Sequence, residues 1–525
     1  MRHRNLSGLA APLLAGLLAA QVTGGAPASA LDTAGRMSDV NGDAFADLVI
    51  GVPGYDVGGH EHAGAVHVIS GRSSGLSLGT NRIITQNTTG LSGTSEAWDE
   101  FGEAVVTGDF NGDLFSDVAI GIPGQRVGGS VSAGAVQIVY GGALGLTTTD
   151  AVLTQTSTGL DTSETGDWYG GSLVVGNFDT DGFDDLAIGA PGEGVGGAIG
   201  AGAVDVIYGS SSGLTGLGGQ HFTLATSGVP GNPGSNDRFG SALAAASFDG
   251  GAGQDLAIGV PGQDLPGASD AGEVIVLRSI GWELTGSGAQ RWNQDSTGIE
   301  GTAETGDEFG AALAAYAFGT DGFGDLAIGV PGEDVAGITD AGSVNLIQGS
   351  ATGLGAHWNR EFDEDVSGMP GRAARYERFG SVLAVGDVGG DILTDLIVGV
   401  PDERLSGIDS AGAVYVIPSW VSAPEAYNVK LFYRGRGVPG TAEWGDRFGA
   451  SVAAGNVNAD YYGDELVIGV PGDQVGGLTG AGSVEVVWSG AFGTGNHGRL
   501  FLSEATPGLE SSPGRFDGFG GDTAA

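Results

Sequence analysis

Acidic and amide side chains recur at fixed spacing in short loops of this chain, and their pattern suits a hard cation. The two best copies run from Asp39 to Asp47 and from Asp109 to Asp117, with oxygen-bearing side chains at loop positions one, three, five and nine. A main-chain carbonyl at position seven would add another of the oxygen ligands that Ca²⁺ prefers. In an EF-hand, position twelve is a glutamate next to a helix, whereas here position twelve falls in a predicted strand. We therefore predict β-hairpin calcium loops.

Five of the seven copies keep enough oxygen ligands to predict a site. The predicted ligands are Asp39, Asn41, Asp43, Phe45 and Asp47; Asp109, Asn111, Asp113, Phe115 and Asp117; Asn177, Asp179, Asp181, Phe183 and Asp185; Asp387, Asp391 and Asp395; and Asn456, Asn458, Asp460 and Asp464, with Glu465 as an alternative to Asp464. The fourth and fifth copies have lost ligands, and we expect them to bind metal weakly or not at all. For one isolated copy a plain Asx-turn would be the better interpretation, but several copies in register favour metal.

The loops belong to a repeat that fills the chain. Each one leads into an apolar segment ending in Gly-x-Pro, and successive prolines are 70 residues apart except for one interval of 68; they are Pro53, Pro123, Pro191, Pro261, Pro331, Pro401 and Pro471. A unit of this length holds about four strands with their turns, which is typical of a propeller blade.

Two further motifs mark the strands of each unit. From the second unit on, an aromatic-Gly pair such as Phe101-Gly102 stands eight residues before the loop, and in every unit an Ala-Gly pair follows the proline by ten residues. The segment Leu48–Val52 is apolar without alternation, as expected for a strand buried between neighbouring blades. We predict an all-β, seven-bladed β-propeller of four-stranded antiparallel blades.

The predicted boundaries use the whole chain. Residues 1–30 have a basic start, an apolar stretch and a small-residue end, which predicts a secretory signal peptide. The predicted propeller covers residues 31–525, and its segments are 31–98, 99–166, 167–236, 237–306, 307–376, 377–445 and 446–516, with 517–525 as a ring-closing segment against blade 1.

Composition narrows the classes of partner. The net charge of −43 disfavours binding to nucleic acid or to anionic lipid. Without cysteines the chain has no disulfides, so bound calcium would substitute for them in stabilising an exported fold. No segment after the signal peptide is long and apolar enough to span a membrane, and we expect a secreted monomer.

The joint motif, aromatic-Gly, then DxNxDxxxD, then DLxIGxPG and AGAV, resembles the FG-GAP repeats of the integrin α-subunit head, a seven-bladed β-propeller. The resemblance implies calcium loops between strands one and two of a blade, on the face opposite the ligand-binding loops. It also implies a binding or adhesion role toward an extracellular protein or glycan.

Catalytic motifs in this sequence are weak. His60 and His62 flank Glu61 without forming HExxH, and the two GxSxG matches, 71–75 and 209–213, follow strands and lack a helix after them. We therefore expect no enzyme, with specificity in the variable loops after each Gly-x-Pro. The alternatives are a hydrolase or lyase with its site at the propeller axis, and a purely structural envelope protein.

Overall fold

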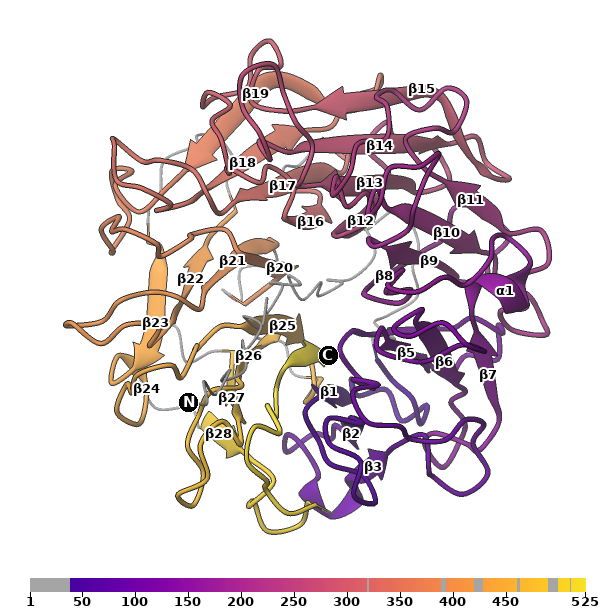
Figure 1. Cartoon of the computed structure of the whole chain (residues 1–525). Helices are drawn as coiled ribbons and strands as arrows, with labels where there is room; N and C mark the ends of the chain where they lie inside the picture. The colour runs from indigo at the N-terminus through magenta and orange to yellow at the C-terminus, as the bar shows by residue number, and fades with distance from the viewer. Residues whose placement is uncertain are drawn as a thin grey trace, which may run out of the picture.

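The computed structural model describes residues 38–318, 321–388, 393–419, 428–459, 463–489, 499–509 and 511–525. Seven sheets stand around a central axis, each running from an inner strand to an outer one (Figure 1). The chain is thus an all-β, seven-bladed propeller, as the repeat predicts. The predicted signal peptide lies outside the described residues.

In blades 2 to 7 the strands follow the chain from the axis outward, whereas in blade 1 the innermost strand is the last strand of the chain. Blade 1 contains β29 (Asp522–Ala524), β1 (Leu48–Val52), β2 (Ala65–Ile69) and β3 (Arg82–Ile84); blade 2 contains β4 (Val105–Gly108), β5 (Asp117–Ile122), β6 (Ala135–Val139) and β7 (Asp150–Leu153); blade 3 contains β8 (Ser172–Gly176), β9 (Asp185–Ala190), β10 (Ala203–Ile207) and β11 (Gln220–Phe222); blade 4 contains β12 (Leu243–Ala246), β13 (Asp255–Val260), β14 (Glu273–Ser279) and β15 (Leu284–Trp292).

The other three blades repeat this order, with one small addition. Blade 5 contains β16 (Ala312–Tyr316), β17 (Asp325–Val330), β18 (Ser343–Gln348) and β19 (Gly355–Phe362); blade 6 contains β20 (Val382–Gly386), β21 (Asp395–Val400), β22 (Ala413–Ile417), β23 (Lys430–Arg434) and the short β24 (Gly437–Val438); blade 7 contains β25 (Ser451–Gly455), β26 (Glu465–Val470), β27 (Ser483–Val487) and β28 (Arg499–Leu502). Pairing is antiparallel throughout except between β23 and β24. The described helices are short: η1 (Leu78–Thr80) and α1 (Gln155–Thr158).

The C-terminal strand supplies the inner strand of blade 1. Strand β29 pairs antiparallel with β1, with Ile50 opposite Thr523 and Gly51 opposite Asp522. The first and last parts of the described chain therefore share one sheet (Figure 1). This pairing covers the exposed edge that β1 would otherwise present.

The repeat motifs meet where one blade contacts the next. Gly64 of an Ala-Gly pair forms a bridge with Phe101 of the following aromatic-Gly pair, and Phe101 is fully buried. A Cβ on Gly64 would lie 2.2 Å from the carbonyl oxygen of Phe101, and its φ of +84° also favours glycine. Equivalent bridges join Gly134 to Tyr169 and Gly202 to Phe239. The constant spacing of the motifs thus follows from blade-to-blade packing.

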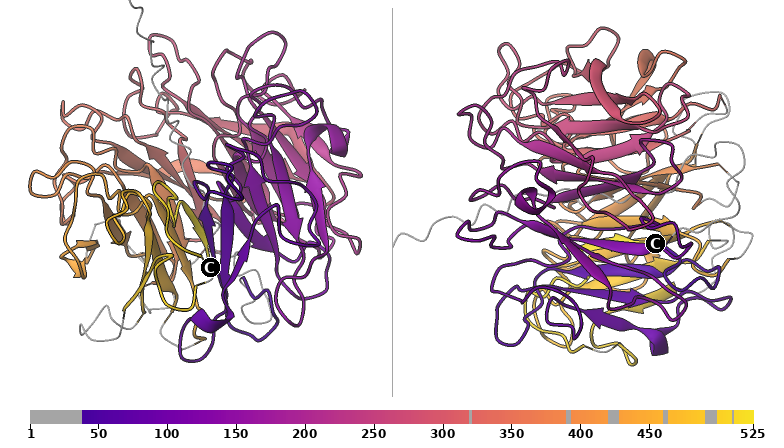
Figure 2. Two further views of the ribbon diagram at one scale, coloured as in Figure 1. Left: turned by 60° about the horizontal axis from the view of Figure 1, so that its bottom comes forward. Right: turned by 90° about the vertical axis from the view of Figure 1, so that its right-hand side faces the viewer.

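The sheet order places the connections on two faces of the ring. Because consecutive strands are antiparallel, the links between first and second strands and between third and fourth strands share one face. The links between second and third strands, and from one blade to the next, share the other. Figure 2 shows these connections projecting on both sides of the ring.

Candidate functional site

Each predicted calcium loop leads into the second strand of its blade, and in blades 2 to 7 it connects the first strand to the second, so the loops lie on one face, called here the acidic face. The third loop joins β8 to β9, and one carboxylate oxygen from each of Asp179, Asp181 and Asp185 lies within 4.8 Å of the others. Burial raises the pKa of Asp185 to about 8, and the pKa of Asp179 is also raised. These carboxylates lie close enough to share one cation.

The first residue of the first two loops accepts hydrogen bonds from the backbone of its own loop. Asp39 accepts hydrogen bonds from the backbone N–H groups of Gly42 at 2.7 Å and Ala44 at 2.8 Å. In the second loop, Asp109 accepts them from Asp113 at 3.0 Å and Leu114 at 2.9 Å. Among the described parts of the acidic loops, only the third brings three carboxylates within 4.8 Å. The third loop makes the same kind of Asx-turn bond, since Asn177 accepts the N–H of Thr180 at 2.7 Å, so the three loops differ in their carboxylate cluster and not in this turn.

The ninth-position carboxylate connects the loop to the sheet. Asp47 accepts a hydrogen bond from Val40 N–H at 3.0 Å and another from Gly71 N–H at 2.8 Å. The same pair of bonds is made by Asp117, Asp185, Asp255 and Asp325. Burial raises the pKa of Asp47 to about 7. This position has a structural role in loops with and without a full set of ligands.

The structure favours Glu465 over the predicted Asp464 for position nine of the seventh loop. Glu465 accepts the N–H of Val457 at 3.1 Å, which is the bond that Asp47 makes in the first loop. Asp464 instead accepts the N–H of Asp387 at 3.0 Å, across to the sixth loop. The predicted ligands Asp391 and Asp460 lie outside the described residues.

In the fourth loop a side chain supplies the positive charge. Arg278 Nη2 lies 2.5 Å from Asp249 Oδ2, and Asp249 occupies position three of that loop. The guanidinium thus neutralises a carboxylate that would face a cation in an intact loop.

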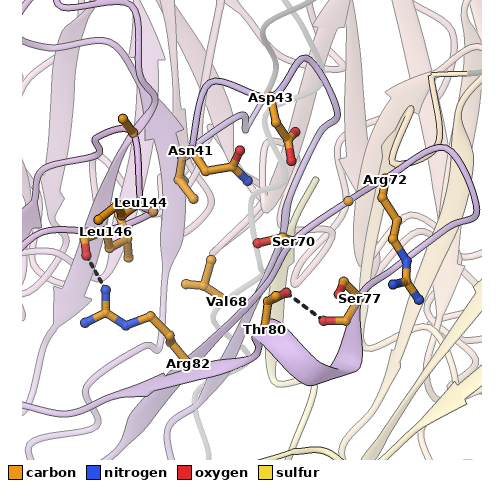
Figure 3. A pocket seen from close by; sticks show the side chains of 14 residues that line it. Asn41, Asp43, Val68, Ser70, Arg72, Ser77, Thr80, Arg82, Leu144 and Leu146 are labelled. Atoms are coloured by element: carbon orange, nitrogen blue, oxygen red, sulfur yellow. Dashed lines mark hydrogen bonds between the residues drawn. The ribbon is translucent and has the colours of Figure 1, made fainter.

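Neighbouring loops also interlock. The ring of Phe115, at position seven, lies over Gly42 of the preceding loop, where a Cβ would be 2.5 Å from the ring. Phe183 covers Gly112 in the same way. A pocket of about 360 Å³ lies beside the first loop, with Asn41 and Asp43 at one end and Arg82 at the other, where Arg82 donates to the carbonyl of Leu146 (Figure 3).

The opposite face carries a set of exposed aromatic side chains that motif analysis missed. They occupy the connections from one blade to the next, and we call them the aromatic rim: Trp98, Trp168, Tyr376, Trp444 and Phe516. Trp98 stacks on His62 with ring centroids 4.2 Å apart, and Arg375 lies over the ring of Tyr376. The sequence signal was present, because the residue three before the aromatic-Gly pair is glycine or asparagine in four units but Trp98, Tyr376 or Phe516 in the other three.

Arginines lie next to this rim. Arg238 and Arg378 flank Glu308, at 3.3 Å and 2.7 Å, and each of the three residues directly precedes an aromatic-Gly pair. Arg447 holds the equivalent position in blade 7. Arg238, Arg378 and Arg447 are three of the 20 lysines and arginines in the chain.

Carboxylates are also present at the inner strands. Burial, with Glu100 and Asp522 nearby, raises the pKa of Glu103 to about 8. Burial likewise raises the pKa of Asp522 to about 8, and Asp522 accepts the N–H of Val105 at 2.8 Å. The histidine pair of the sequence motif does not form a metal cluster with Asp56, since His62 stacks on Trp98 and its backbone N–H donates to Asp56 at 3.0 Å.

A seven-bladed propeller with an acidic loop at each inner hairpin defines the class of this protein. The FG-GAP repeat family matches residues 33–69, 101–139, 169–207 and 379–417. The chain therefore carries FG-GAP repeats, and its propeller resembles that of integrin α subunits, as predicted. No helix of the described residues has the length and apolar character to cross a membrane.

Relatives of two kinds match this chain. Integrin alpha-PS5 of Drosophila melanogaster is 35% identical over 166 residues, covering 31% of this chain and 15% of the relative. Phosphatidylinositol-glycan-specific phospholipase D of Bos taurus is 30% identical over 186 residues, covering 35% of this chain and 21% of the relative. The same enzyme name belongs to a relative in Dictyostelium discoideum, 26% identical over 254 residues, with 46% of this chain and 24% of the relative covered. The chain thus spans a quarter or less of these relatives.

The phospholipase relatives correct one expectation. From the absence of catalytic motifs we expected no enzyme, but several relatives are named as enzymes. The expectation was wrong because these repeats occur in binding proteins and in enzymes alike, so a repeat motif does not separate the two classes.

Proposed function

We propose that this chain is a secreted, calcium-stabilised FG-GAP propeller that binds an extracellular protein or glycan through the aromatic rim, in adhesion or a related role. The observation that carries the proposal is the backbone conformation of three rim residues. Trp98, Tyr376 and Phe516 have φ values of 67°, 65° and 64°. Bulky side chains are rarely found in this left-handed region.

The equivalent positions in other blades show what the fold itself requires. They are Gly166, Asn236, Gly306 and Gly445, all with positive φ and all of residue types that adopt this conformation readily. Trp98, Tyr376 and Phe516 are between 49% and 56% exposed, so burial does not account for aromatic side chains there. Strained and exposed aromatic residues are typical of a binding surface.

The test compares the two faces. Wild type and the W98G/Y376G/F516G variant are screened for binding to immobilised glycans and extracellular proteins. The matched control is W282A, because Trp282 is 70% exposed but lies between β14 and β15, on the acidic face. Binding lost in the triple variant and kept in W282A would support the proposal. Binding equal in all three proteins would refute it.

Calcium binding is the second part of the proposal and is supported by the Asp179–Asp181–Asp185 cluster. The D179N/D181N variant should bind less calcium than wild type in a calorimetric titration. D321N is the matched control, because Asp321 accepts the N–H of Phe323 as Asp181 accepts that of Phe183, but its loop has no oxygen-bearing side chain at positions one and three. An equal calcium stoichiometry in D179N/D181N and wild type would exclude this site.

A second candidate function is hydrolysis near the axis. It is favoured by the neighbouring carboxylates of Glu103 and Asp522 beside the inner strands β4 and β29, because burial raises the pKa of each to about 8 and such an acid can donate a proton at neutral pH. The relatives named as phospholipases suggest phosphatidylinositol-glycan as the first substrate to test. Turnover by wild type that E103Q abolishes would support this function, and no turnover would exclude it for this substrate.

A further inference from the structure

The seven blade junctions share a polar layer built from three equivalent positions. One residue lies at the end of the fourth strand of a blade or just after it, the second stands two residues before the next aromatic-Gly pair, and the third stands two residues after the next Gly-x-Pro. These sets are Gln86, Asp99 and Gln125; Gln155, Asp167 and Glu193; Leu224, Asp237 and Gln263; Gln294, Asp307 and Glu333; Glu364, Glu377 and Glu403; Arg434, Asp446 and Asp473; and Glu504, Asp517 and Tyr55.

At most of these junctions, nitrogen donors meet the buried oxygens. Gln155 donates to Glu193 at 2.6 Å, and Gln294 donates to Glu333. At the junction of blades 6 and 7, Arg434 donates to both oxygens of Asp473, at 2.6 Å and 2.5 Å, and its Nη1 lies 3.8 Å from Asp446. In four of the seven sets the first position therefore supplies a nitrogen donor, from Gln86, Gln155, Gln294 or Arg434.

The junction of blades 5 and 6 has three carboxylates instead. Glu364 follows β19, Glu377 precedes β20 and Glu403 follows β21. One oxygen of each lies within 4.8 Å of the others, and the exposed fractions of the three residues are 2%, 2% and 7%. Burial raises the pKa of all three groups. This cluster has carboxylates like the neighbouring junctions, but it lacks the guanidinium or amide group that donates to them there.

The hydrogen bonds at this junction leave two buried oxygens without a partner. The Tyr415 hydroxyl donates to Glu364 Oε1 at 2.5 Å, and Glu377 accepts the N–H groups of Ala374 at 2.7 Å and Arg404 at 3.1 Å. Glu364 Oε2 and Glu403 Oε2 are buried and accept no hydrogen bond. Buried, unpaired carboxylate oxygens are costly unless a cation or a proton meets them.

We propose that Glu364, Glu377 and Glu403 bind a Ca²⁺ ion that joins blade 5 to blade 6. Ca²⁺ binds oxygen at about 2.3–2.6 Å, so ligands on opposite sides of one ion stand about 4.8 Å apart, which is the limit within which these oxygens lie. Mg²⁺ fits less well, because it needs shorter bonds and retains several waters that a buried junction does not accommodate. The ion takes the role that Arg434 has at the next junction.

The fourth acidic loop has a similar substitution, since Arg278 pairs with Asp249 where the intact loops are proposed to bind a cation. A divalent ion offsets two of the three charges, and Tyr415 with the N–H groups of Ala374 and Arg404 stabilises the third by hydrogen bonding. The site lies among the links between blades, on the face opposite the acidic loops. It is therefore distinct from the calcium loops of the proposed function.

The test counts bound calcium in the full chain by equilibrium dialysis with ⁴⁵Ca after treatment with EDTA. The E364Q/E403Q variant should bind one ion fewer than wild type. Its matched control is E333Q, which turns the Gln294–Glu333 junction into the Gln–Gln pair already present as Gln86 and Gln125. E333Q should bind as many ions as wild type. Equal counts in all three proteins would overturn the proposal, whether or not the acidic loops bind calcium.

A second variant keeps the test valid if E364Q/E403Q does not fold. E364R reproduces the arginine of the next junction, so it should lose one calcium ion and melt at a higher temperature than wild type in EDTA. The alternative is that the three glutamates share protons. In that case E364R would bind as many calcium ions as wild type, and the proposal would be wrong.

Discussion

Replacing Tyr376 by glycine separates binding from folding on the aromatic rim. Tyr376 has a φ of 65°, and the equivalent residue in three other blades is a glycine: Gly166, Gly306 and Gly445. Relief of the left-handed conformation should stabilise the fold by about 1–2 kcal/mol. Against this, the larger unfolded-state entropy of glycine costs about 0.5–1 kcal/mol. Loss of the exposed contact with Arg375, 5.3 Å from the ring centroid, costs about 0.5–1 kcal/mol more.

These contributions nearly cancel, so the free energy of unfolding of Y376G should lie within about 1 kcal/mol of the wild-type value. Urea denaturation followed by tryptophan fluorescence gives the free energy of unfolding, and the slope with urea shows whether both proteins expose the same surface. The same preparation is then tested for the partner found with wild type, where we expect weaker binding. A loss of more than about 2 kcal/mol would refute the reasoning, because the ring would then have a structural role that its exposure does not reveal.

Three other perturbations test other parts of the structure. Removing calcium with EDTA should lower the melting temperature, because a loop with a dissociation constant of about 0.1 mM stabilises the fold by about 1.4 kcal/mol at about 1 mM calcium. An unchanged melting temperature in calorimetry would exclude structural calcium. In EDTA, the free energy of unfolding should rise as the pH falls from about 8 to about 5. Burial raises the pKa of Glu193 to about 7 and of Glu333 to about 8, so over this range the folded chain binds protons that the unfolded chain releases. Urea titrations that show the opposite trend would contradict this expectation. R434A should destabilise the chain by about 3–5 kcal/mol, because it leaves the buried Asp473 and Asp446 unpaired. Arg436 is exposed and provides the control: R436A should change the free energy of unfolding by less than about 0.5 kcal/mol.

The fold was predictable because each repeated motif has a packing reason. The aromatic-Gly and Ala-Gly pairs recur at fixed spacing because Phe101 and Gly64 touch across a blade junction, so the spacing records a contact. The aromatic rim and the glutamate junction were harder to predict. Each depends on a departure from the repeat, such as Tyr376 in place of glycine or Glu364 in place of glutamine, and such departures have meaning only once the shared conformation or contact is known.

The ninth loop position shows why the count of acidic residues overstates the evidence for metal. Asp255 and Asp325 remain in the two eroded loops, and each accepts one N–H from its own loop and another from a residue at the end of the third strand or directly after it. Those bonds give the fold its own reason for an aspartate there, whether or not a cation binds. In the first three loops, the side chains at positions three and five bond within their own loop, so they are the better indicator of metal. By that criterion the third loop, with Asp179 and Asp181 beside Asp185, is the strongest candidate, and the fourth, where Arg278 pairs with Asp249, is the weakest.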